Sequence, residues 1–312
     1  GSVNLNEIAD TVRYLTDGIA KYDKYDYSIV ECLLPADTQI AFPDYTNFDG
    51  LRAWPVVEIK NNCFRYIRFT GDFKMNNLEI VNGYDFYKSI FDGIFEGIKI
   101  KNIGDYAFFN SHFSGALNLP VCTYIGYAAF NNSNFSGSLN LPACTHIGDR
   151  AFRNSNFSGS LSLPVCTFIG ANAFQNSNFS GELSLPACTY IGNNAFYYSN
   201  FSGSLNLPMC TFIGNNAFIN SNFTGSLDLP VCEYIGDDAF QNSNFSGSLN
   251  LPVCVRVKDR AFRNSHFSGS LSLPVCIYIG GYTFENSNFT QITIGANAVL
   301  GTDCIGAHSQ EF

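Results

Sequence analysis

The sequence predicts an elongated α/β solenoid built from repeated units of 22 residues with a parallel β-sheet. Three observations lead to this prediction. A cysteine recurs at a fixed period, two leucines separated by one polar residue precede each cysteine, and no residue is inserted between units. The recurring cysteines are Cys122, Cys144, Cys166, Cys188, Cys210, Cys232, Cys254 and Cys276.

The unit follows the template L-x-L-P-x-C-x-x-I-G-x-x-A-F-x-N-S-x-F-[ST]-G-x. In the unit that begins at Leu139, leucines alternate with a polar residue, which is typical of a half-buried strand. Pro142 ends this strand because proline cannot donate a ladder hydrogen bond. The stretch before Gly148 is expected to be a second short strand, and residues 149–154 to form one short helical turn. Two Leu, the Cys, the Ile, the Ala and two Phe of each unit are expected to face inward.

The motif L-x-L-P-x-C followed by I-G-x-x-A-F resembles the BspA-like, or treponemal-type, leucine-rich repeat. The resemblance is strong from Leu117 to Thr290 and weak from Leu51 to Ala116. It implies a leucine-rich-repeat fold and a non-enzymatic surface protein of adhesin type, since familiar members of this group bind host matrix proteins, host cells or other microbes. The unit here is about one residue shorter than the family pattern, and Asn154-Ser155 stands where many relatives have a cysteine. No particular partner follows, because fold alone does not define function.

Four segments are expected along the chain. From Asn4 to Gly18, apolar residues recur at helical spacing, which predicts an amphipathic helix that caps the solenoid together with loops and a short strand near Ser28–Leu34. Counting back by 22 from the regular units exposes three degenerate ones that start near Leu51. The expected segments are an N-terminal cap in 1–50, three degenerate repeats in 51–116, eight regular repeats in 117–292, and a C-terminal cap and tail in 293–312.

Composition limits the classes of partner. The net charge is −9, from 26 acidic and 17 basic residues, which argues against nucleic acid or an anionic membrane surface. No run of about 18 apolar residues occurs, so no membrane insertion is expected. The family resemblance implies a secreted or cell-surface protein. Gly1-Ser2 and Glu311-Phe312 look like cloning scars, so we expect the signal and anchor to lie outside this fragment.

The cysteines are expected to be buried free thiols. In-register stacking places one cysteine about every 4.8 Å in a single row, whereas zinc needs four converging ligands. Parallel neighbours also orient their Cβ atoms alike, which fits a disulfide poorly. Cys32, Cys63 and Cys304 lie outside this row, and the sequence leaves a capping disulfide among them open.

Catalysis, a cofactor and a metal are not expected. The histidines His112, His146, His266 and His308 occupy scattered repeat positions and form no constellation. Glu233, Asp237 and Asp238 lie close together in one unit, but no loop with calcium-ligand spacing surrounds them. A solvated acidic edge is the favoured interpretation of these three acids.

The candidate binding residues are a row of aromatic side chains two positions after the cysteines. Because the cysteine and the following isoleucine face inward, the residue between them is expected to face outward and offer an apolar binding surface. The alternative is a row of rings that stack on one another and stiffen the sheet. His146 and Arg256 interrupt the row, whose members are Tyr124, Phe168, Tyr190, Phe212, Tyr234 and Tyr278.

Three functions remain open from the sequence. The leading one is adhesin-type binding of a protein or glycan partner, the second is a spacer or stalk, and the third is recognition of a repeating ligand, either glycan or ice. A flat polar row on the strand face would suit the third. That row contains Asn118, Asn140, Ser162, Ser184, Asn206, Asp228, Asn250 and Ser272. Residues after Ile-Gly vary between units, as expected of a protein-specific site.

Overall fold

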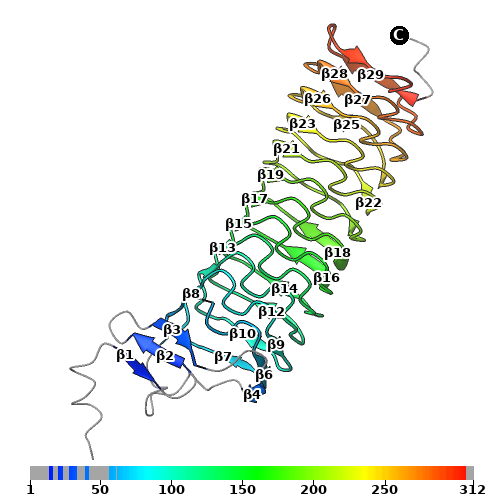
Figure 1. Cartoon of the computed structure of the whole chain (residues 1–312). Coiled ribbons are helices and arrows are strands. Elements are labelled where there is room, and N and C mark those ends of the chain that lie inside the picture. Colours follow the sequence, from blue (N-terminus) through cyan, green and yellow to red (C-terminus); the bar gives the residue numbers. More distant parts are fainter. Residues whose placement is uncertain are drawn as a thin grey trace, which may run out of the picture.

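The computed structural model describes residues 14–16, 20–23, 28–33, 39–41, 56–60 and 62–306. The chain winds into a rod of stacked coils, with the degenerate units at one end and the last regular unit near the other (Figure 1). Equivalent residues of neighbouring coils pair in register, as Tyr190 does with Phe212. The parallel solenoid that the sequence predicts is therefore confirmed.

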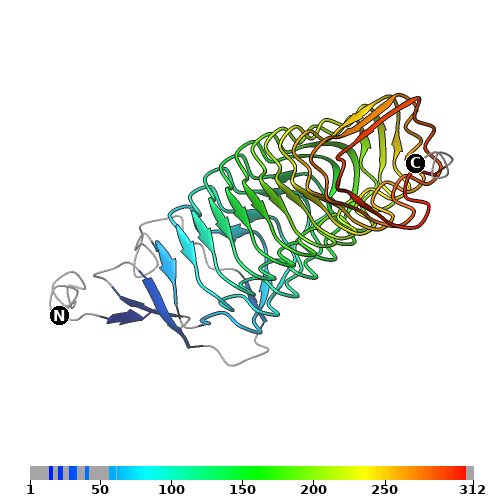
Figure 2. The ribbon, with the colours of Figure 1, turned by 90° about the horizontal axis from the view of Figure 1, so that it is seen from above.

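One sheet of 15 strands runs the length of the rod, and its strands follow one another along the axis (Figure 2). Each unit contributes the stretch that ends at the inward isoleucine or valine. The parallel strands that the units contribute are β5 (Glu58–Ile59), β8 (Ile80–Val81), β11 (Asn102–Ile103), β13 (Tyr124–Ile125), β15 (His146–Ile147), β17 (Phe168–Ile169), β19 (Tyr190–Ile191), β21 (Phe212–Ile213), β23 (Tyr234–Ile235), β26 (Arg256–Val257) and β28 (Tyr278–Ile279). The second strand of the unit, rather than the leucine strand, thus forms the continuous sheet.

The leucine strands and the stretch before them form shorter parallel sheets on other sides of the coil. Four strands at this position of the unit make one sheet, β7 (Phe73–Lys74), β10 (Phe95–Glu96), β12 (Leu117–Asn118) and β14 (Leu139–Asn140), and three make another, β25 (Leu249–Asn250), β27 (Ser270–Leu273) and β29 (Gln291–Ile294). The remaining strands are β6 (Arg68–Thr70), β9 (Ile90–Phe91), β16 (Ser158–Ser162), β18 (Asn178–Ser184), β20 (Ser202–Gly203), β22 (Asn222–Gly225) and β24 (Asn244–Phe245).

The core is a set of columns, one for each inward position of the unit. The predicted inward residues are buried in the regular units; in the unit 161–182 they are Leu161, Leu163, Cys166, Ile169, Ala173, Phe174 and Phe179. Phe174 stacks on the equivalent ring of each neighbour, with 5.3 Å between centroids on both sides. Burial of such side chains is the main source of stability. Since each column is shared between coils, a single unit has no core of its own.

A column of buried serines was not predicted. Sister residues of Ser133 are buried in every unit from Ser89 to Ser287. The hydroxyl of Ser133 donates to the carbonyl oxygen of Phe108 at 3.0 Å, and that of Ser265 donates to Phe240 at 3.2 Å. These two hydroxyls each satisfy a buried carbonyl of the preceding coil.

The predicted helical turns are wrong. The described residues contain no helix, and residues 149–154 form tight turns instead. Arg150 and Asn154 both have a φ of 58°, whereas a right-handed helix needs negative φ throughout. The amide of Phe152 donates to Ala173 of the next coil at 2.8 Å rather than to a residue of its own coil.

The predicted N-terminal helix is also wrong where the structure describes it. β1 (Tyr14–Thr16) pairs antiparallel with β2 (Ala20–Asp23), which pairs antiparallel with β3 (Ser28–Cys32). Residues 4–13 of the predicted helix lie outside the described residues. The strand expected near Ser28 is present and pairs in parallel with β5, while β4 (Gln39–Ala41) pairs with β6. Strands therefore cover two sides of the first coil.

At the other end the ladder continues one residue out of period. Leu271 pairs with Ile292, and Tyr278 pairs with the first residue of β30 (Val299–Leu300). Both steps are 21 residues, whereas the steps between regular units are 22. Among the described residues, no helix has the length and apolar character that crossing a bilayer requires.

Candidate functional site

A continuous strip of rings lies on the outward side of the long sheet. We define the ring row as Tyr124, His146, Phe168, Tyr190, Phe212 and Tyr234, each the first residue of its strand. In-register pairing of β13 to β23 places these side chains above one another because the following isoleucine of each strand faces the core. Centroids of adjacent rings lie 4.5–4.9 Å apart, and their planes differ by 2–11°.

The rings cover one another's faces. Tyr124, at the end of the row, is 40% exposed, while the other five are half-buried. Each inner ring has a neighbour against both faces, so the surface that it offers to a partner is its edge. The row is thus both outward-facing and self-stacked, which combines the two arrangements that the sequence left open.

The sixth predicted residue is separate from the row. Arg256 stands between Tyr234 and Tyr278 in the sheet. The Tyr278 ring instead lies 5.0 Å from the ammonium of Lys258, and its hydroxyl donates to Asp259 at 3.3 Å. The structure therefore brings five of the six predicted residues together, joined through His146, and leaves Tyr278 apart.

A row of threonines holds the backbone beside the rings. The hydroxyl of Thr189 donates to the carbonyl oxygen of Thr167 at 3.0 Å, and that of Thr211 donates to Thr189 at 3.1 Å. The five threonines of this row, each one residue before a ring, are all exposed: Thr123, Thr145, Thr167, Thr189 and Thr211. Two further residues of this column, Val255 and Ile277, are apolar and also exposed, so the polar flank of the ring row ends where Arg256 interrupts it.

The buried thiols support the row from inside. The thiol of Cys188 donates to the carbonyl oxygen of Tyr190 at 3.4 Å, and that of Cys210 donates to Phe212 at the same distance. Burial raises the pKa of the Cys210 thiol to about 12, so it stays protonated at neutral pH. All eight recurring cysteines are buried and free, as predicted, and so are Cys63 and Cys304.

The row carries little charge. Burial lowers the pKa of His146, which lies between two rings, and the nearby Asp149 opposes this only in part. Burial, together with Asp237, raises the pKa of Tyr234. A partner would meet a strip of apolar edges with tyrosine hydroxyls rather than an ionic site.

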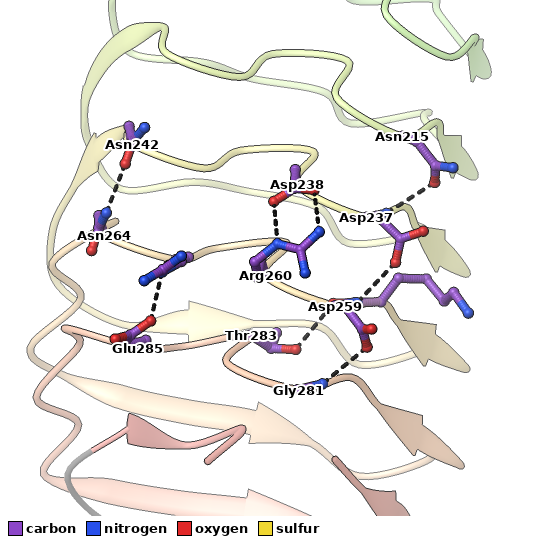
Figure 3. A network of polar contacts seen from close by, with 12 residues as sticks. Asn215, Asp237, Asp238, Asn242, Asp259, Arg260, Asn264, Gly281, Thr283 and Glu285 are labelled. Carbon is purple, nitrogen blue, oxygen red and sulfur yellow. Dashed lines mark hydrogen bonds and ion pairs between the residues drawn. The ribbon is translucent and has the colours of Figure 1, made fainter. Parts of the chain in front are cut away.

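The acidic group near Glu233 is engaged within the fold. Asp237 accepts the amide of Asp259 at 3.1 Å, and both carboxylate oxygens of Asp238 accept from Arg260 (Figure 3). Within the described part of the chain, no three potential metal ligands converge. Both aspartates therefore act in turn-to-turn contacts.

A second group of rings was missed by the sequence reasoning. Tyr84, Tyr87, Tyr106 and Tyr127 come together at the turns of two degenerate units and the first regular unit. The available signal was the variation after Ile-Gly, since few other units carry an aromatic residue at these positions.

The stacked 22-residue units define a repeat scaffold of the solenoid class. Residues 57–181 and 189–308 match the model of the BspA-type leucine-rich repeat region, in six copies. The chain belongs to this family. Its fold is that of a leucine-rich-repeat solenoid, and a binding or recognition role is consistent with the family.

No curated protein matches the chain. Among solved structures, the chain is similar to the leucine-rich-repeat ectodomain of the plant membrane receptor kinase GASSHO1/SCHENGEN3 from Arabidopsis thaliana, in complex with Casparian strip integrity factor 2. The identity is 11% and the TM-score 0.25, over 82% of this chain and 46% of the ectodomain. The chain thus spans less than half of that ectodomain, and a likeness of this size says nothing about a partner.

Proposed function

We propose that this protein is a non-enzymatic recognition module of adhesin type, secreted or on a cell surface, that binds a host or microbial partner through the ring row. The observation that carries the proposal is the strip of six stacked rings on the outside of the long sheet. A contiguous apolar strip on a protein surface is typical of an interaction site. Rings fixed by stacking also lose little side-chain entropy when a partner binds.

The exposed edges favour a protein partner over a glycan. Sugars pack on the face of an aromatic ring, and the inner faces of the row are covered by neighbouring rings. Tyrosine and phenylalanine edges with hydroxyls, by contrast, are common in protein interfaces. Glycan binding through this row would be limited to the outer faces of Tyr124 and Tyr234.

A spacer is the second candidate function, and the same stacking supports it. Continuous ring contacts along the sheet stiffen a rod whether or not anything binds. The third candidate, a repeating glycan or ice, is supported by the regular polar face, where the amide of Asn140 donates to Asn118 at 2.7 Å.

A triple substitution separates these candidates. A panel of purified extracellular-matrix proteins and a glycan array would first identify a ligand for the unaltered protein. Changing Tyr190, Phe212 and Tyr234 together to Ser should then reduce affinity for a protein ligand by tenfold or more. The matched control changes Ser162 and Ser184 to Ala on the polar face and should bind normally. A triple variant that binds as well as the unaltered protein, but unfolds at much lower denaturant, would favour the spacer.

A further inference from the structure

A second surface patch lies at the turns that follow the strands of the long sheet in the early units. It combines aromatic rings with three cations and shares no residue with the ring row. We define the turn patch as Arg65, Tyr66, Tyr84, Tyr87, Lys88, Tyr106, Phe109, Tyr127 and Arg150. Stacking of the coils brings these residues from five units into one surface.

The rings of the turn patch are packed face to face. Tyr84 stacks on Tyr106 with centroids 4.9 Å apart, and Tyr87 stacks on Phe109 at 5.2 Å. Tyr106 also contacts Tyr127 at 5.1 Å. Their faces are therefore largely occupied, and their hydroxyls and edges remain at the surface.

Three cations hold the edges of the patch. The Arg65 guanidinium lies 4.8 Å from the Tyr66 ring and 5.0 Å from the Tyr87 ring, and the Lys88 ammonium lies 5.5 Å from Tyr87. At the opposite edge, the Arg150 guanidinium lies near the Tyr127 ring and donates to its hydroxyl. All three cations are exposed.

Two nearby aspartates accept hydrogen bonds from backbone amides. Asp105 accepts the backbone amide of Tyr127 at 2.7 Å, and Asp85 is fully buried, where it accepts the amides of Asn62 and Asn82. The turn patch itself thus contains three exposed cations and no acid, on a chain whose net charge is −9. Such a local excess of positive charge attracts anionic groups.

Four residues of the turn patch occupy strained backbone. The φ angles of Tyr66, Tyr84, Lys88 and Tyr106 are 62°, 64°, 54° and 57°. For a residue with a bulky side chain this left-handed conformation costs about 1 kcal/mol or more, whereas asparagine tolerates it. Most regular units carry asparagine at the position of Tyr66 and Lys88, as Asn176 shows, and three of them carry it at the position of Tyr84 and Tyr106, as Asn172 shows.

Asparagine would also serve the fold better at one of these positions. In the column that contains Tyr66 and Lys88, later asparagines form an amide ladder, with Asn132 donating to Asn110 at 2.8 Å and Asn154 donating to Asn132 at 2.7 Å. Tyr66 and Lys88 cannot form this amide ladder, and their backbone is strained as well. Strained residues that present side chains to solvent are characteristic of functional surfaces.

We propose that the turn patch binds an acidic segment of a partner polypeptide. Tyrosine and arginine are the residue types that dominate protein interfaces, and the three cations and the tyrosine hydroxyls at the surface are donors that suit carboxylates. A glycan is disfavoured because stacking leaves few ring faces for a sugar. This inference goes beyond the proposed function, since the turn patch and the ring row are altered by different substitutions.

The test begins with a peptide display library of random 12-residue sequences, selected on the immobilised protein. Enriched peptides should carry a net negative charge and bind more weakly as salt rises. The combined variant Tyr84→Asn, Lys88→Asn and Tyr106→Asn should weaken the best peptide at least tenfold. Replacing the peptide's Glu and Asp by Gln and Asn should have a similar effect.

The asparagine substitutions keep the test interpretable because asparagine tolerates positive φ. It occupies the Lys88 position in most regular units and the Tyr84 and Tyr106 position in three of them. The combined variant should unfold at the same or a higher denaturant concentration. Tyr198→Asn is the matched control, since Tyr198 has a φ of 60° and is 59% exposed but lies outside the turn patch. This control should leave peptide affinity unchanged.

Three results would overturn the proposal. The first is enrichment of only neutral or basic peptides, and the second is selection of peptides whose affinity the combined variant does not change. The third is patch-dependent binding of heparin without any patch-dependent peptide, which would assign the surface to an anionic polysaccharide. In each case the triple substitution in the ring row would still report separately on the proposed function.

Discussion

Arg260 binds both carboxylate oxygens of Asp238, one coil earlier, with Nε and one terminal nitrogen each at 2.8 Å (Figure 3). The two residues occupy the same repeat position, where both have positive φ, 56° and 55°. The hydrogen bond to Asp238 is the main reason why the pKa of Arg260 is raised. An ion pair thus joins two turns at a position where the preceding three units carry asparagine.

A double-mutant cycle should measure this contact. Asp238→Asn and Arg260→Asn both place at the turn a residue that tolerates its backbone. The coupling free energy should be about 0.5–1 kcal/mol, because the Arg260 side chain is 41% exposed and solvent screens the pair. Denaturant unfolding at low and at 1 M salt would measure it. The coupling should shrink at high salt, and a salt-independent value would contradict an ionic contact.

Native thiol labelling should be slow at all eight recurring cysteines. These thiols are buried and donate to backbone carbonyls, as Cys188 does to Tyr190. A thiol reagent at pH 8 should label few of them in the folded protein and all of them in denaturant. Rapid labelling of the whole row in the folded protein would show that the column is open to solvent.

The same burial predicts a loss of stability at alkaline pH. The pKa of Cys122, Cys166 and Cys210 is raised by burial to about 12, above the value near 8.5 of an unfolded thiol. The unfolded chain therefore releases protons first, so this contribution is complete below about pH 8.5 and is lost as pH rises toward the folded pKa. Each thiol should lower the unfolding free energy by up to about 1.4 kcal/mol per pH unit in this range.

Unfolding curves between pH 8 and 9.5 would check the pH slope. A variant with Cys166→Ala and Cys210→Ala should be less stable at pH 8, because small cavities remain, but its stability should fall less steeply with pH. Equal slopes for the two proteins would show that the thiols are not responsible.

Arg256→Tyr should stabilise the rod by joining Tyr234 to Tyr278. Arg256 pairs in register with both, and each new stacked pair is worth about 0.5–1.5 kcal/mol beyond burial. The midpoint of denaturant unfolding should rise. Arg256→Gln is the control, because it removes the charge without adding a ring. A gain with Gln equal to the gain with Tyr would mean that charge, not stacking, had opposed stability.

Deletion of residues 1–50 should cause aggregation or loss of a cooperative melt. The deletion removes β3 and β4, the partners of β5 and β6. It leaves the open edge of a long sheet beside Ile59 and Phe69, which are buried in the full chain. Light scattering and thermal unfolding would test this. A monomeric protein with an unchanged melt would show that these strands do not protect the solenoid.

The period and the inward positions could be predicted because the sequence repeats them without insertion. The columns that contain Leu163, Cys166 and Phe174 each hold one residue type in nearly every regular unit. The serine column was missed because a hydroxyl is not counted as core, and only the hydrogen bond from Ser133 to Phe108 explains its burial.

The tight turns could not be predicted because the Ala-Phe spacing fits a helix as well as it fits a turn. The available signal was asparagine, which tolerates positive φ. Most regular units carry it at the position of Asn176, and three carry it at the position of Asn172. The prediction of an N-terminal helix failed for a similar reason. Its apolar spacing fits a helix, but the open edge of β5 pairs with a strand, and this contact is invisible in the local sequence.

For the candidate site, the sequence predicted that the rings lie on one side of the sheet. It did not predict the distances between them. Whether outward rings separate or stack depends on side-chain packing between coils. The interruption by Arg256 was visible, and the structure shows that it isolates Tyr278 from the other rings.

The constant spacing of the contacts between coils determines how the gene can gain or lose repeat units. The threonine, asparagine and ring contacts of a regular unit all reach residues 22 positions away. Gain or loss of one whole block of codons would therefore rebuild the same neighbours at the junction. The identical tracts at 149–155 and 259–265 are what such an event leaves behind. Copy number could thus adjust the reach of the rod in steps of about 4.8 Å, without any new packing having to evolve.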